Sequence, residues 1–345
     1  MTTEVTLVDE GRTADVQPPD AGVPSRRRVS LFLERYSLLL LTAAIIVFFC
    51  LDPATSSTFP AARNIKNVLG DESVLIVVTL AVLFPLICGE FDFSVGATAT
   101  ASQIAVASAS AEHSLGVPLS VVIGVGVGVA VGAVNTILVT RVGISGIIAT
   151  LGVGTLLAGL VMLYTDGRAI VGGIPTSITD FGANDVLGVP AITICTVGFG
   201  MLVLYALTFT PSGRYLYAVG SNRKAARLVG LKVERLIGGS FMLSGTLAGV
   251  AGVLLVARNG VGDPQIGGTS LTLEALSAAF LGATAIRPGR FNVVGAVVAV
   301  FFIAFSVSGL SLAGAKGWVS DVFNGTALIV AVAVSTYFAR RRMQA

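Results

Sequence analysis

Five polar residues in or beside the apolar runs of this chain are candidates for a solute path, and three of them lie in the stretch C-G-E-F-D-F-S-V-G-A, residues 88–97. There Glu90, Asp92 and Ser94 alternate with apolar residues. A charged side chain costs roughly 2.5–3.5 kcal/mol to insert into a bilayer, so charges inside apolar segments mark candidate solute or ion pathways. Helical spacing would scatter the three side chains, whereas a local break, permitted by the flanking glycines, would bring them together.

Two interpretations of this stretch stay open at the level of sequence. The three side chains line a translocation path, or the stretch is an ordinary turn in which Asp92 or Ser94 caps the next helix. Asn135 and Glu274 complete the candidate path. Asn135 equally suits a hydrogen bond between helices. Glu274 equally suits a first helical turn, where the helix dipole favours an acid.

Little else in the chain suits catalysis or metal binding. It has one histidine, and its three cysteines lie far apart in apolar runs. Neither the phosphate-binding pattern G-x-x-x-x-G-K-[ST] nor a strand followed by G-x-G-x-x-G occurs. We therefore expect no metal site, no cofactor, no ATP-binding loop and no enzymatic activity.

Long apolar helices must position these polar residues. The chain of 345 residues is 54% hydrophobic and 12% charged, about half the charge of a soluble domain. Its uncharged runs are long enough to cross a hydrocarbon core of about 30 Å. We expect an all-α polytopic membrane protein with about ten transmembrane helices. These are placed near residues 36–51, 72–88, 93–111, 117–140, 144–164, 189–209, 236–257, 271–286, 291–311 and 318–338.

The third and eighth spans are the weakest, because the third is rich in small polar residues and the eighth is short. Either could be broken or re-entrant. The basic residues set the orientation, since Lys and Arg accumulate on the cytoplasmic side. With ten crossings and both termini cytoplasmic, all but five of the 22 basic residues lie inside. The five outside are Arg63, Lys66, Arg168, Arg258 and Lys316.

Composition divides the chain into three parts. Residues 1–29 are expected to form a disordered cytoplasmic tail, residues 30–339 the transmembrane domain, and residues 340–345 a basic cytoplasmic tail. Glycines spaced four apart, at 124, 128 and 132 and again at 245 and 249, let helix backbones approach closely in lipid. We favour packing within one subunit over a dimer face for these glycines.

The loop over residues 211–235 concentrates basic residues and contains a single acid, Glu234. Within it, Asn222 is a suitable N-cap and Gly230 stands where a helix ends. The segment between them carries small and apolar residues, so it predicts a short capped helix. Such a helix suits docking into a cleft of a partner protein, although a simple positive-inside label or a lipid contact stays open.

At this loop the chain resembles the ribose-type simple-sugar permeases of bacterial ABC importers. The family's G-x-x-D-L-S-V-G element appears as G-E-F-D-F-S-V-G at 89–96, and its outer-loop Y-T-N-G as Y-T-D-G at 164–167. Its cytoplasmic loop G-R-Y-x-Y-A-x-G-x-N-x-x-A-A-R-L-x-G appears nearly complete at 213–230. Two departures are Glu90, where the family commonly has glycine, and Arg287–Pro288 in the turn over 282–290.

The resemblance implies that the cytoplasmic loop carries a coupling helix, which docks on a separate ATP-binding subunit. An extracytoplasmic solute-binding protein would deliver the substrate, and two permeases, in a homodimer or a heterodimer, would form the pathway in the bacterial cell membrane. Membrane lipid is then the surrounding partner, and nucleic acid is not. The coupling residues are expected to be Gly220, Asn222, Arg223, Ala225, Ala226, Arg227, Leu228 and Gly230.

We therefore expect a permease subunit of an ATP-driven importer, which moves a simple sugar or sugar-like solute by alternating access. The alternative is an ion-coupled secondary transporter that uses the intramembrane carboxylates Glu90, Asp92 and Glu274. Uptake that needs an ion gradient and no ATPase partner would favour the alternative.

Overall fold

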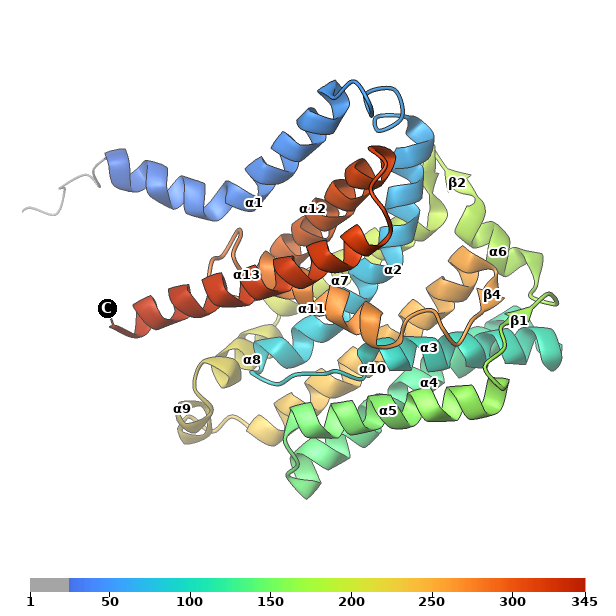
Figure 1. Ribbon diagram of the computed structural model, residues 1–345. Coiled ribbons are helices and arrows are strands. Elements are labelled where there is room, and N and C mark those ends of the chain that lie inside the picture. The colour runs from blue at the N-terminus through green and yellow to red at the C-terminus, as the bar shows by residue number, and fades with distance from the viewer. Residues whose placement is uncertain (1–24, 345) are drawn as a thin grey trace, which may run out of the picture.

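A computed structural model describes the fold of residues 25–344 and the side-chain surroundings of residues 35–333 (Figure 1). The α-helices are α1 (Ser25–Leu51), α2 (Ala62–Ile87), α3 (Val95–Ala107), α4 (Val117–Ile137), α5 (Gly146–Thr165), α6 (Thr176–Ala183), α7 (Ala191–Phe209), α8 (Pro211–Ser221), α9 (Arg223–Leu228), α10 (Val233–Asn259), α11 (Gly268–Gly282), α12 (Val293–Leu312) and α13 (Trp318–Gln344). Two π-helical turns, η1 (Ser108–Glu112) and η2 (Leu138–Val142), extend α3 and α4.

Each of the ten expected spans coincides with a helix. Within the described chain, six helices are long and apolar enough to cross a membrane: α2, α4 with η2, α5, α7, α10 and α12. The apolar parts of α1 and α13, Arg35–Leu51 and Trp318–Ala333, are shorter. The short helices α3 and α11, with 13 and 15 residues, are the two spans that the sequence marked as weakest. The all-α polytopic class is confirmed, and the number of crossings stays a prediction.

The expected terminal tails lie mostly at the limits of what is described. Residues 1–24 are outside the described part of the chain, and α1 begins at Ser25, a few residues before the expected end of the N-terminal tail. At the other end, α13 continues to Gln344, into the expected basic tail.

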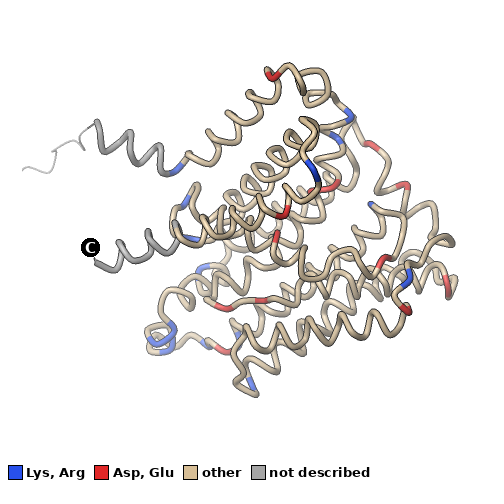
Figure 2. Tube along the Cα trace, in the orientation of Figure 1, with Lys and Arg blue, Asp and Glu red and all other residues tan. Residues whose placement is uncertain are grey.

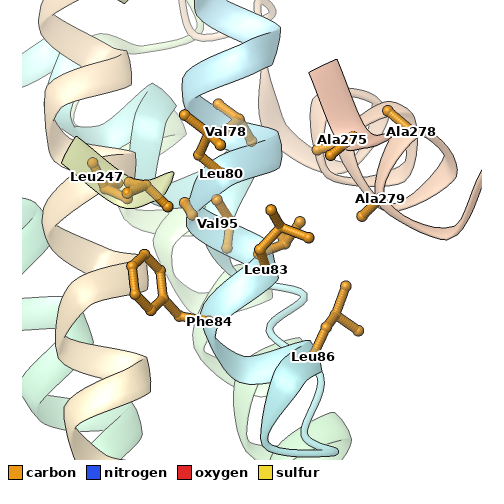
Figure 3. Packing of buried hydrophobic residues seen from close by; sticks show 14 of the residues in the cluster. Val78, Leu80, Leu83, Phe84, Leu86, Val95, Leu247, Ala275, Ala278 and Ala279 are labelled. Atoms are coloured by element: carbon orange, nitrogen blue, oxygen red, sulfur yellow. The ribbon is translucent and has the colours of Figure 1, made fainter. Parts of the chain in front are cut away.

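The core is built around α2, because this helix is buried on nearly all sides. In its apolar window 89% of the residues are buried, against 33% for α5. Figure 3 shows side chains of α2, such as Leu80 and Leu83, between Leu247 of α10 and the alanine-lined face of α11. A helix that is apolar all round and enclosed by other helices is what this composition predicts. The break that follows α2 is therefore attached to the most buried of the six candidate spans in the described chain.

The glycine faces of α4 and α10 pack directly on each other. A Cβ atom on Gly128 would lie 2.2 Å from the carbonyl oxygen of Gly245, and one on Gly245 would lie 2.4 Å from that of Gly128. Ser102 of α3 donates to the carbonyl oxygen of Gly249 at 2.8 Å. Packing within the subunit, the favoured interpretation of these glycines, is confirmed for these positions.

In the described part of the chain, four strands of two residues each join loops to one another. β1 (Ile170–Val171) pairs antiparallel with β4 (Val261–Gly262), and β2 (Asp185–Val186) pairs with β3 (Val189–Pro190). β1 and β4 lie on loops almost a hundred residues apart in sequence, so this pairing joins the α5–α6 connection to the α10–α11 connection.

Basic residues gather toward the end of the molecule that carries α9, as Figure 2 shows. The loop between α11 and α12 lies at the same end of the helices, where the backbone N–H of Ile286 donates to the carbonyl oxygen of Arg35 at 2.8 Å. Gly89 and Arg290 line one pocket with residues of α8. The start of the apolar part of α1, the end of α2 and the α8–α9 segment thus share one side of the fold.

Candidate functional site

The chain leaves the helix between α2 and α3. Pro85 lies in the last turn of α2, the helix ends at Ile87, and Gly89 has a φ of 75°, a region that glycine enters without a steric penalty. Residues 88–94 then run as turns and extended chain up to Val95, where α3 begins. The local break predicted from the sequence is therefore present.

Inside the break, Asp92 is the centre of a buried hydrogen-bond network. Its side chain is 1% exposed. One carboxylate oxygen accepts from the backbone N–H and the hydroxyl of Ser94, at 3.0 and 2.6 Å. The other oxygen accepts from the hydroxyl of Ser244 in α10 at 2.8 Å. Ser94 in turn accepts from the amide nitrogen of Asn135 in α4 at 2.8 Å.

This network joins three segments that are far apart in sequence. Asp92, Ser94 and Asn135 were predicted, and the structure brings them together; Asn135 makes the hydrogen bond between segments that was its alternative interpretation. Ser94 precedes α3, but its side chain does not cap that helix and bonds Asp92 instead. A buried carboxylate must be hydrogen-bonded to be tolerated, so removing one member would leave the others unsatisfied. The network braces the break against α4 and α10.

Ser244 is the member that the sequence analysis missed. It is one small polar residue in a long apolar segment, and nothing in its spacing relates it to Asp92, 152 residues earlier. Only the packing of α10 beside the break brings the two together.

Glu90 points away from this network and pairs with the cytoplasmic loop. A guanidinium nitrogen of Arg223 lies 2.8 Å from its carboxylate. The same nitrogen donates to the carbonyl oxygens of Cys88 and Gly89 at 3.2 and 3.1 Å. Arg223 thus attaches α9 to the start of the break through three contacts. The Glu90 side chain is 13% exposed, so the pair is more shielded than an ordinary surface ion pair.

The predicted short helix is α9, and its cap is the predicted one. The Asn222 side-chain oxygen accepts from the backbone N–H of Ala225 at 3.0 Å. Gly230 has a φ of 84°, and its N–H donates to the carbonyl oxygen of Arg227 at 3.0 Å. This left-handed glycine after the last turn ends the helix in the usual way.

The predicted coupling residues separate into a set that packs against the rest of the permease and a set that is exposed. A Cβ atom on Gly220 would lie 1.8 Å from the carbonyl oxygen of Ile87, so α8 touches the end of α2 backbone to backbone. Ala226 is buried, and Arg227 pairs with Glu234 of α10. The most prominent member of the exposed set is Leu228, whose side chain is 88% exposed.

Leu228 continues into an exposed apolar surface. The neighbouring Val229 is 76% exposed, and Ala225 is exposed as well. An apolar tip on an otherwise basic helix is unexpected for a solvated loop. It is suited to contact with another protein.

Glu274 does not join the Asp92 network. It lies six residues after the start of α11 at Gly268, so it is not in a first helical turn, and that interpretation is wrong. Its electrostatic neighbours are Glu72 of α2 and Asp321 of α13. Glu72 was not singled out from the sequence, although an acid directly before a long apolar run was the available signal.

The carboxylates of this second group do not assemble a metal centre. Within residues 35–333 no cluster of three or more His, Cys, Asp or Glu side chains has an arrangement that could hold a metal ion.

Comparison with known proteins places these features in a family. Residues 64–332 match the family described as "branched-chain amino acid transport system / permease component". The chain is 29% identical to the ribose import permease protein of Haemophilus influenzae, with 90% of this chain and 95% of that protein covered. It is 32% identical to the ribose import permease protein of Bacillus subtilis, covering 84% and 88%.

A third relative is the D-allose transport system permease protein of Escherichia coli, 27% identical over 88% of this chain and 92% of that protein. No solved structure matches the chain. The family match spans the break, the capped loop helix and all the long apolar helices. The chain therefore belongs to this family of permease components of ABC importers, multi-pass proteins of the cell membrane that form a solute pathway and leave ATP hydrolysis to a separate subunit.

Proposed function

We propose that this permease imports a simple sugar or a sugar-like solute by alternating access. The support comes from its relatives, which are named for ribose and D-allose import and, in Salmonella, for autoinducer 2 import. The partners are an ATP-binding subunit, a solute-binding protein on the outer side and a second permease that completes the pathway.

One observation carries the mechanism: Arg223 links α9 to the break after α2. Arg223 contacts the carboxylate of Glu90 and two backbone carbonyl groups of the break. Because both ends of this link belong to short, well-defined elements, a displacement of α9 is transmitted to residues 88–94. The adjoining Asp92 network then passes it to α4 and α10.

The exposed tip of α9 is the proposed docking surface. Leu228, Val229 and Ala225 enter a cleft of the ATP-binding subunit, and the capped helix beneath them keeps the tip rigid. ATP-driven closure of two such subunits moves the helix as a body and switches access to the pathway. A lipid label would need neither the cap nor the apolar tip.

The candidate path residues take two places in this scheme. Asp92, Ser94 and Asn135 hold the inner gate through their mutual hydrogen bonds, and Glu90 connects that gate to α9. Glu274, with Glu72 beside it, acts nearer the outer side, where the solute enters.

Ten crossings with both termini cytoplasmic complete the proposal. Support comes from the distribution of basic residues and from the shared location of Arg35, the α11–α12 loop and α8–α9. Single cysteines at positions such as Ser221 and Ser311, labelled in intact cells with an impermeant thiol reagent, test it. Labelling of position 221 before permeabilisation would overturn the orientation.

The function is tested by uptake into proteoliposomes that contain the permease, its ATP-binding subunit and the solute-binding protein. Radiolabelled ribose and allose, offered separately, are expected to accumulate only with ATP. Collapsing the proton and sodium gradients with ionophores should leave uptake unchanged. Uptake that follows an ion gradient without the ATP-binding subunit would establish the ion-coupled alternative.

A further inference from the structure

A pocket with a strongly basic lining lies beside the inner end of α7. Its volume is about 250 Å³. The pocket lies where the end of α7 meets α8 and the loop between α11 and α12, and a second pocket of about 610 Å³ adjoins it. Its lining consists of Leu207, Thr208, Arg214, Tyr217, Arg287 and Arg290.

The three arginines of this pocket have no acidic partner among the described side chains. Among the side chains of residues 35–333, no carboxylate lies within ion-pair distance of Arg214, Arg287 or Arg290, whereas Arg223 and Arg227 of the coupling helix are both paired. Three guanidinium groups around one small space repel one another, and an anion placed between them would remove that repulsion. The arginine fork also matches the oxygen atoms of a phosphate group.

The pocket is held open by its own hydrogen bonds. Tyr217 of α8 donates to the carbonyl oxygen of Phe291 at 2.7 Å, which ties α8 to the α11–α12 loop. The Asn292 side chain donates to the carbonyl oxygens of Gly282, Ala285 and Arg290 at 3.1–3.2 Å and so fixes the loop. Burial raises the pKa of Tyr217, while Arg287 and Arg290 act in the opposite direction. The arginines are therefore presented on a fixed frame.

The depth of the pocket matches that of lipid headgroups. Tyr205 and Phe209, both exposed, stack with ring centroids 5.9 Å apart on the last turns of α7. Aromatic side chains at the end of a span mark the membrane interface, and Leu207 and Thr208 of the pocket lie on the same turns. Further along α7, Met201 and Leu202 are exposed apolar residues that acyl chains can cover.

We propose that this pocket binds the phosphate group of an anionic phospholipid from the inner leaflet, with the acyl chains lying along α7. Basic pockets at the cytoplasmic ends of membrane helices suit such headgroups. The bound lipid lies against α8, the helix that leads into the coupling helix, so it supports the segment on which docking depends. The same chemistry would recognise free phosphate, but only a lipid also uses the exposed face of α7.

The test compares lipid retention by purified permease variants. R214Q/R287Q/R290Q removes the pocket charge. The matched control is R141Q, which replaces an exposed arginine in η2, the turn that packs against the start of α10. Native mass spectrometry in detergent reports how many dioleoyl-phosphatidylglycerol molecules remain bound. Titration with the same lipid, or with dioleoyl-phosphatidylcholine, reports the shift in apparent Tm.

We expect wild type and R141Q to retain phosphatidylglycerol in preference to phosphatidylcholine. The triple glutamine variant should bind phosphatidylglycerol at least about tenfold more weakly. The variant R214K/R287K/R290K keeps the charge and shows an intermediate affinity, so the proposal stays testable if the glutamine variant folds poorly. Inorganic phosphate at about tenfold excess over the lipid should not displace it.

Three results would overturn the proposal. Displacement of the lipid by inorganic phosphate would make this a site for a soluble anion. Equal loss of lipid in R141Q would show a response to overall charge. Unchanged lipid binding by the triple variant, combined with loss of the ATP-binding subunit, would reassign the arginines to that partner.

Discussion

Two groups of carboxylates lie in the same apolar surroundings, and their partners differ. In the break after α2, Asp92 receives three hydrogen bonds and Glu90 pairs with Arg223. In the opposite half of α2, Glu72 has Glu274 as an electrostatic neighbour, and Glu274 has Asp321. The acids of the break are held by Ser94, Ser244 and Arg223, whereas the acids of the second group have other acids as their electrostatic neighbours. An acid fixed by hydrogen bonds or an ion pair holds neighbouring segments together. An acid beside other acids is suited to interact with a solute.

Asp92→Ala is expected to have the largest effect and to disrupt the hydrogen-bond network of the break. It leaves the hydroxyls of Ser94 and Ser244 without their acceptor in a buried site, which costs about 1–3 kcal/mol for each unsatisfied group. Uptake should be abolished and the apparent Tm in detergent should fall by several degrees. Asp92→Asn, which keeps an acceptor oxygen, is the control and should be affected less. An unchanged Tm for Asp92→Ala would contradict the bracing role.

The link between Glu90 and Arg223 is tested by charge reversal. Arg223→Glu places two carboxylates together, so we expect uptake to fall about tenfold or more while the protein still inserts. The double variant Glu90→Arg/Arg223→Glu restores an opposite-charge pair and should recover part of the uptake. If the effects of the two single changes on the logarithm of the uptake rate simply add in the double variant, the two side chains do not act together.

Leu228→Asp separates docking from folding. Because this side chain is 88% exposed, the substitution should change stability by no more than about 0.5 kcal/mol. Co-purification with the ATP-binding subunit should fall about tenfold or more, since an apolar contact at the centre of an interface is lost. Leu187→Asp, in the turn between β2 and β3 and 98% exposed, is the matched control. Equal binding of the subunit by both variants would exclude α9 as the docking surface.

Glu274→Gln should give the smallest effect and probes the group of Glu72, Glu274 and Asp321. Removing one of the neighbouring carboxyl groups relieves like-charge repulsion, so we expect the apparent Tm to rise by about 2–4 °C. The solute concentration that gives half-maximal uptake should change by about threefold at most, and the maximal rate should stay the same. A loss of uptake as complete as that of Asp92→Ala would make the two groups alike.

The features that could be predicted well from the sequence are those that depend on residues close together in the chain. The cap of α9 by Asn222 and its end at Gly230 follow from local backbone preferences. The break at 88–94 follows from alternating polar residues between glycines. The apolar runs gave the helices, because length and hydrophobicity need no knowledge of packing.

The parts that it missed depend on which helices become neighbours. The Ser244–Asp92 and Arg223–Glu90 contacts join segments more than a hundred residues apart, and a single sequence offers no way to pair them. The helical limits shifted for a similar reason, since α11 begins at Gly268 through contacts with α3, such as that of Gly268 with Thr100. Glu274 thereby moved out of the first turn in which it was expected.

The contact between the glycines of α4 and α10 sets a limit on how the molecule can move. Backbones that touch at Gly128 and Gly245 leave no room for one helix to slide past the other, because the next side chain would collide with main-chain atoms. The two helices therefore move together as one rigid body. Opening and closing is then absorbed outside this pair, by the short non-helical stretch between α2 and α3 and by the turn between α9 and α10.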